Sequence, residues 1–209
     1  MSHYRTVLVL GSALALSACK PAEDPVVQSP PAPQAAEPSA SPSQTRLAAS
    51  ARANLSAVGD SGVGGDLAFD IDNGGVRVTG TVSGLEPGST HGFHVHEFGD
   101  CSAPDASSAG GNFNPTQQPH GERQAEASHH AGDMHNLVAG DDGQARVDQR
   151  LAGLEIGSNG ATDIIGKSVI VHADADDYRT QPSGDAGGRL ACGVIALENA
   201  PPSDAGPAD

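Results

Sequence analysis

The most informative stretch of the chain reads HGFHVHEFGD and spans residues 91–100. If it is extended, His94 and His96 project from one face of a strand, because successive side chains alternate between the two faces. Phe93 and Val95 then point the opposite way, into a core. Two imidazoles placed in this way can bind one metal ion while the strand stays packed, and imidazole suits copper and zinc in particular.

A bare His-x-His pattern is also compatible with two exposed histidines on the surface of a sheet. In this chain, however, His172 ends a second apolar run over residues 168–172. Between the two runs lies a cluster of further ligand-type side chains, made up of His120, His129, His130 and Asp133. With so many ligand-type residues, a metal centre is the better interpretation.

These segments resemble the copper,zinc superoxide dismutase family. The further matches are Ser108-Ala109-Gly110-Gly111, Phe113-Asn114-Pro115, His120-Gly121, His130-Ala131-Gly132-Asp133, Val171-His172 and Gly188-Arg189-Leu190-Ala191-Cys192-Gly193. They follow the order and spacing of the family, so the resemblance is specific. It implies an all-β, Greek-key antiparallel β-sandwich or flattened barrel, with two long functional loops at about 102–136 and 173–190.

The hydrophobic pattern predicts an antiparallel β structure independently of the resemblance. Apolar and polar residues alternate over 66–72 and again over 76–82, and the intervening Asn73-Gly74-Gly75 predicts a hairpin turn. Further strands are predicted around residues 91–97, 145–151, 168–172 and 192–197. No helical periodicity of any length is present.

The resemblance also implies roles for individual residues. Copper would be held by His94, His96 and His172, and zinc by His120, His130 and Asp133. Asp176 matches a carboxylate that joins a copper-ligand histidine to a zinc-ligand histidine and fixes their orientation.

Arg189 and two cysteines complete the implied site. Arg189 matches the catalytic arginine at the mouth of the copper channel, where a guanidinium attracts an anion and donates hydrogen bonds to it. The alternative is a surface arginine paired with Asp185. Cys101 and Cys192 match the intrasubunit disulfide of the family.

One position departs from the family pattern. Asn112 lies between Gly110-Gly111 and Phe113-Asn114-Pro115, where the family has a histidine shared by copper and zinc. Asparagine cannot become an anionic bridge, so zinc keeps three protein ligands, with water or Asn112 completing the site. We therefore expect weaker zinc binding and an active but impaired dismutase.

The expected function is that of an oxidoreductase that converts superoxide to oxygen and hydrogen peroxide by redox cycling of copper. The alternative is an exported lipoprotein that sequesters or delivers copper or zinc without turnover. The presence of Arg189 favours catalysis, because a metal buffer has no need of an anion guide.

Composition limits the partners of the chain. Its 209 residues carry a formal net charge of −15, which argues against nucleic-acid binding, where a basic face is expected. The length predicts one domain plus tails. The oligomeric state stays open between a monomer and a homodimer.

The N-terminus predicts export to the cell envelope. Arg5 precedes an apolar run over residues 7–16, which is too short for a permanent membrane span. Residues 16–19 resemble a bacterial lipobox, with Cys19 as the lipidated residue, although an ordinary signal peptide with a coincidental cysteine is the alternative. Lys20 at the next position is typical of lipoproteins sorted to the outer membrane, so a periplasmic location with a lipid anchor in that membrane is expected.

The predicted organisation follows from these assignments. A signal peptide covers residues 1–18, and the lipidated cysteine begins a linker rich in Pro, Ala and Ser over 19–45. The superoxide dismutase-like domain covers 46–198, and a disordered tail covers 199–209.

Overall fold

The computed structural model describes residues 50–123 and 128–198. The predicted signal peptide, Cys19, the linker and the tail lie outside the described residues. No helix within these two described ranges is both long enough and apolar enough to span a membrane.

The described residues form strands and one short 3-10 helix. The elements are β1 (Ser50–Ala57), β2 (Gly64–Asp72), β3 (Gly75–Ser83), β4 (Thr90–His91), β5 (Phe93–His96), the 3-10 helix η1 (Ser107–Ala109), β6 (Leu137–Val138), β7 (Ala145–Ala152), β8 (Ser168–His172), β9 (Arg189–Val194) and β10 (Ala196–Leu197). The larger sheet has the order β5-β8-β9-β1-β2-β3-β7, with β10 paired to β1, and β4 pairs with β6 separately. All of these pairings are antiparallel.

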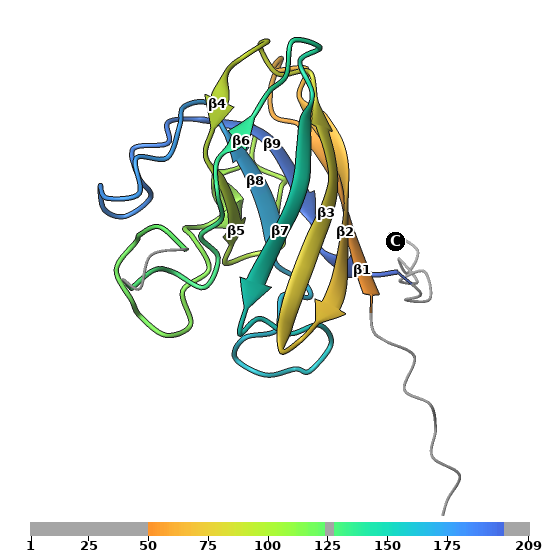
Figure 1. Ribbon diagram of the computed structural model, residues 1–209, viewed down its shortest axis with the longest axis vertical. Coiled ribbons are helices and arrows are strands. Elements are labelled where there is room, and N and C mark those ends of the chain that lie inside the picture. Colours follow the sequence, from red (N-terminus) through yellow and green to blue (C-terminus); the bar gives the residue numbers. More distant parts are fainter. Residues whose placement is uncertain (1–49, 124–127, 199–209) are drawn as a thin grey trace, which may run out of the picture. The chain divides into compact units, whose positions relative to one another are not determined.

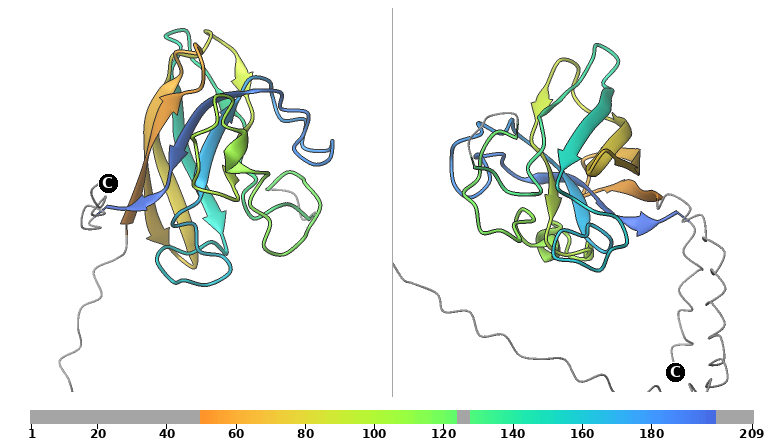
Figure 2. Two further views of the ribbon diagram at one scale, coloured as in Figure 1. Left: turned by 180° about the vertical axis from the view of Figure 1, so that it is seen from behind. Right: turned by 60° about the horizontal axis from the view of Figure 1, so that its bottom comes forward.

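The large sheet curls so that its two halves face each other. In Figure 1, β1, β2, β3 and β7 form one layer, and β5, β8 and β9 lie behind it; Figure 2 shows the same curl from two other directions. Strand β1 joins the halves, because it pairs with β2 along most of its length and with β9 at Ser56 and Ala57. Side chains from both halves fill the space between them, including Phe69, Val78 and Val169, which are fully buried. The all-β prediction is therefore confirmed.

The predicted hairpin is present. Strands β2 and β3 pair from Gly64 with Ser83 to Asp72 with Gly75. The two turn residues, Asn73 and Gly74, have φ values of 42° and 78°. Positive φ at both positions matches the right-handed twist of the flanking strands, which is why the Asn-Gly pair is favoured there.

The predicted strand over residues 91–97 is interrupted at Gly92. Residues before the glycine pair with β6 and residues after it pair with β8. A Cβ atom at Gly92 would lie 2.7 Å from the Cβ of Ala186, so the loop that follows β8 packs directly on the backbone here. The alternation that places Phe93 and Val95 in the core nevertheless holds over β5.

Strand β1 was not among the strands predicted from the sequence. Its buried positions alternate regularly, at Ala51, Ala53 and Leu55. Two of these three side chains are only methyl groups, which gives a weak hydrophobic signal in the sequence.

A disulfide joins the loop after β5 to strand β9. Cys101 and Cys192 have their Cα atoms 5.8 Å apart and are separated by 91 residues in sequence. Cys192 pairs with Ile170 across the β8–β9 ladder, so the bridge ties that loop to the centre of the second layer.

Replacing both cysteines by serine should lower the free energy of unfolding by about 4 to 5 kcal/mol, because closing so long a loop removes entropy from the unfolded chain. Urea unfolding of the metal-free protein measures this difference. A loss below about 1 kcal/mol would contradict the prediction.

Candidate metal centre

Three buried histidines converge on one side of the second layer. His94 and His96 come from β5, and His172 ends β8, which pairs with β5. Each is at most 4% exposed. One ring nitrogen from each lies within 4.8 Å of the others.

The second nitrogen of each imidazole is held by the surrounding protein. His94 donates from Nε2 to Asp176 Oδ2 at 2.8 Å, and His96 donates from Nδ1 to the Gly110 carbonyl at 2.9 Å. His172 Nδ1 lies 3.5 Å from the carbonyl of Gly187. These contacts leave His94 Nδ1, His96 Nε2 and His172 Nε2 to face one another, which is how orienting partners prepare histidines for a metal.

A second set of ligand-type side chains lies in the loop between β5 and β6. Asp133 Oδ1 is 3.1 Å from His120 Nδ1 and 3.3 Å from His130 Nδ1. The other carboxylate oxygen, Oδ2, accepts hydrogen bonds from the backbone amides of Gly121 and His130. Two imidazole nitrogens and one carboxylate oxygen therefore point to a common position, a donor set that suits tetrahedral zinc.

Unsatisfied polar atoms test whether this arrangement fits metal ions. The nitrogens His94 Nδ1, His120 Nδ1 and His130 Nδ1 are buried without a hydrogen-bond partner. His96 Nε2 and His172 Nε2 are 3.2 Å apart, and each ring directs its other nitrogen toward a carbonyl, so two lone pairs face each other. A buried polar atom without a partner is unfavourable. A cation at each position would satisfy these atoms, so the residues fit two metal ions.

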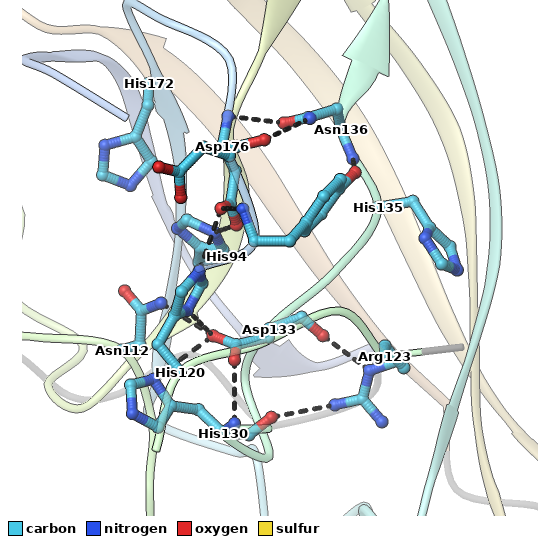
Figure 3. A network of polar contacts seen from close by, with 12 residues as sticks. His94, Asn112, His120, Arg123, His130, Asp133, His135, Asn136, His172 and Asp176 are labelled. Atoms are coloured by element: carbon cyan, nitrogen blue, oxygen red, sulfur yellow. Dashed lines mark hydrogen bonds and ion pairs between the residues drawn. The ribbon is translucent and has the colours of Figure 1, made fainter. Parts of the chain in front are cut away.

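Asp176 connects the two sets. Its Oδ2 accepts from His94 and its Oδ1 accepts from His120 Nε2 at 2.9 Å (Figure 3). The backbone amide of Tyr178 also donates to Oδ1. One carboxylate thereby orients one imidazole of each set.

Two residues whose contacts with Asp176 the sequence did not predict hold this carboxylate in place. Asn136 donates to the Asp176 carbonyl and accepts from its amide, each at 2.9 Å. Gly184 packs so closely that an added Cβ would lie 1.7 Å from Asp176 Oδ1. Neither residue carries a motif that reveals this role, because the contacts join loop segments far apart in sequence.

The two sets differ in their proton affinity. Burial, together with the neighbouring His94 and Arg189, lowers the pKa of His172 to about 3. Burial also holds the pKa of His96 well below its ordinary value. Burial alone would lower the pKa of His120, but the neighbouring carboxylates of Asp133 and Asp176 outweigh it and raise that pKa to about 9. His96 and His172 are thus neutral and ready to bind metal, whereas a metal bound by His120 must displace a proton.

Asn112 lies beside the second set. Its side-chain amide donates from Nδ2 to Asp133 Oδ1 at 2.8 Å (Figure 3), while its Oδ1 is buried without a partner. Its backbone forms an isolated bridge with that of His96. The main chain of Asn112 therefore pairs with His96 of the first set, and its side chain contacts Asp133 of the second set.

Arg189 lies next to the first set and is partly buried. It donates to the carbonyls of Ala106 and Gly110, the latter at 2.6 Å. Burial lowers the pKa of its guanidinium. The alternative pairing with Asp185 is not among the ion pairs formed within residues 50–123 and 128–198.

The remaining histidines lie outside both sets. His91 donates from Nδ1 to the His172 carbonyl at 2.8 Å, and its Nε2 lies 2.6 Å from the Ser89 hydroxyl oxygen, so it supports the backbone of a ligand-type residue. His129 and His135 are partly buried and belong to neither group of ligand-type residues.

Comparison with known proteins agrees with this geometry. Residues 63–195 match the family described as copper/zinc superoxide dismutase. The chain belongs to this family. The family uses copper and zinc, and the two sets can hold both metals.

Individual members of the copper/zinc superoxide dismutase family are similar to this chain in sequence, and a solved SOD-like structure is similar to it in fold. The chain is 42% identical to superoxide dismutase [Cu-Zn] 2 of Brassica juncea, in an alignment covering 66% of this chain and 91% of the relative. It is 39% identical to an extracellular superoxide dismutase [Cu-Zn] of Brugia pahangi, over 65% of this chain and 70% of the relative. The crystal structure of a SOD-like protein from Bacillus subtilis superposes with a TM-score of 0.62 at 35% identity, over 68% of this chain and 96% of that one.

Replacing Asp176 by asparagine should weaken binding at both metal positions of this superoxide dismutase fold by about 10- to 100-fold, because the amide cannot accept from both imidazoles. Competition with chelators measures the affinity for each metal separately. Asp177→Asn is the matched control, since this neighbouring carboxylate is exposed and accepts only from groups of its own loop. A loss confined to one metal would contradict the linking role.

Proposed function

We propose that the chain is a superoxide dismutase of the cell envelope that converts superoxide to oxygen and hydrogen peroxide. In this proposal His94, His96 and His172 hold copper, and His120, His130 and Asp133 hold zinc. When bound, copper supplies the redox chemistry by alternating between two oxidation states. The protein orients the three copper histidines and keeps His96 and His172 neutral, and Arg189 guides the anion.

The observation that best supports turnover over metal storage is a shared carbonyl. Gly110 accepts hydrogen bonds from both Arg189 and the ligand-type His96. The guanidinium is therefore fixed beside a copper imidazole, where a positive charge attracts superoxide and can donate hydrogen bonds to it. A protein that only stores metal gains nothing from this arrangement.

We further infer that Asn112 occupies the place of the bridging histidine. Its amide donates to Asp133 Oδ1, so in the metal-free protein it supports a zinc-ligand carboxylate. A neutral amide cannot become an imidazolate, so it cannot bridge two metals or take up and return a proton between them. Zinc then has three protein ligands, and the two metals are joined only through Asp176 and its hydrogen bonds.

Replacing Asn112 by histidine should therefore raise the dismutation rate by up to about tenfold, or some 1.4 kcal/mol in the barrier. The measurement is superoxide decay after pulse radiolysis, with both proteins loaded with copper and zinc. Asn54→His is the matched control, because it adds a histidine at an exposed position of β1 and reports on copper bound adventitiously.

A second result decides between the two functions. His172→Ala, which lacks a copper ligand in this proposal, sets the background rate. If the unaltered protein is no faster than this variant and Asn112→His restores turnover, the chain is a metal-binding lipoprotein on a dismutase scaffold.

We also propose that the mature protein begins at Cys19 and is anchored by lipid to the outer membrane, facing the periplasm or the cell exterior. The basis is the apolar run over residues 7–16 followed by the lipobox-like residues 16–19. The linker over 19–45 would then tether the domain over 46–198 to the membrane.

Cys19→Ser should abolish incorporation of radiolabelled palmitate and release the protein from the membrane fraction, because the sulfur that carries the lipid is lost. Labelling of expressing cells, followed by fractionation, measures both effects. An unaltered protein that is cleaved and exported without label would contradict the anchor.

A further inference from the structure

Arg123 directs its guanidinium against the turn that carries two of the three proposed zinc ligands. Its Nε donates to the Asp133 carbonyl at 2.5 Å, and its Nη2 donates to the Ala131 carbonyl. The same nitrogen lies 3.5 Å from the His130 carbonyl. Figure 3 shows Arg123 on the side of Asp133 away from the imidazoles, with dashed lines to the turn.

The guanidinium is a cation bound by main-chain oxygens. No carboxylate lies within ion-pair distance of it among the described residues. An arginine guanidinium is protonated at neutral pH, so the side chain carries a positive charge. Carbonyls at the end of a tight turn point the same way and attract a cation, as at the end of a helix. The planar fork of arginine can reach several of them at once.

Arg123 also joins the turn to the third proposed ligand, because it follows His120 by three residues. A second hydrogen bond joins the same two segments: the backbone amide of Gly121 donates to Asp133 Oδ2 at 3.2 Å. The segment over 120–123 is thus hydrogen-bonded to the turn over 130–133 through two residues, Gly121 and Arg123. None of these contacts involves a histidine of the copper set.

We propose that Arg123 is a positioning residue for zinc. It fixes the relative placement of His120, His130 and Asp133 before the metal arrives, which lowers the cost of ordering them on binding. Such pre-ordering matters most at a site where only three protein ligands bind the metal and no fourth protein ligand is present. The inference rests on the zinc set of the proposed function and predicts an effect on zinc that copper does not share.

The test is metal binding by the full chain, with Arg123→Met compared with the unaltered protein. Chelator competition should show zinc affinity reduced by about 10- to 100-fold, as is typical when an orienting partner is removed, while copper affinity is unchanged. Cobalt substituted for zinc should show a weaker and altered visible spectrum. Arg123→Lys should retain part of the zinc affinity, because the single ammonium group of lysine can contact fewer carbonyls than the planar guanidinium of arginine.

Arg150→Met is the matched control. Arg150 likewise donates to two main-chain carbonyls of a turn, those of Asp72 and Asn73, but at the β2–β3 hairpin. Its removal should leave zinc affinity unchanged. Thermal unfolding of the metal-free variants shows whether each one folds, and Arg123→Gln replaces Arg123→Met if the latter does not.

Unchanged zinc affinity in the variant, or equal losses for zinc and copper, would overturn the positioning role. These results differ from the one expected if the proposed zinc ligands themselves are wrong. If the unaltered protein itself binds no zinc through His120, His130 and Asp133, the ligand set is wrong, and the role of Arg123 is rejected with it.

Discussion

The site depends on one buried carboxylate. Asp176 accepts from His94 on one oxygen and from His120 on the other, and it thereby determines which nitrogen each ring presents to its metal position. A carboxylate without partners would be costly in so buried a place. Here two imidazoles and a backbone amide satisfy it, and their hydrogen bonds outweigh burial and hold its pKa below the ordinary range.

In the proposed assignment, Asn112 changes the balance between the two metal positions. A histidine in its place would be shared by both metals on this proposal, whereas the side-chain amide of Asn112 contacts only the second set, through Asp133. The histidines proposed to hold copper are carried by strands of the large sheet and are oriented by backbone carbonyls and by Asp176. The residues proposed to hold zinc lie in a loop and depend on contacts between its segments. On this proposal the lack of a bridging histidine affects zinc more than copper, and the contacts of Arg123 matter for the same reason.

Much of the fold could be predicted from residue patterns. Strict alternation around Asn73-Gly74 determines the β2–β3 hairpin, and alternation in β5 separates His94 and His96 from Phe93 and Val95. These features depend only on the period of a strand and on the φ preferences of turn residues. The break at Gly92 could not be predicted, because it arises from close packing of Ala186, which is distant in sequence.

The all-β class and the positions of the ligand-type residues could be read from the sequence, because they follow from local periodicity and spacing, whereas the departure at Asn112 is implied by the resemblance to the family. Which atoms face each other depends on the tertiary structure. It places Asp176 between His94 and His120, directs the amide of Asn112 to Asp133, and brings Arg123 to the carbonyls of the turn over 130–133. Such contacts join segments separated by loops, and the side-chain and backbone directions that create them are set by packing, which leaves no periodic signal in the sequence.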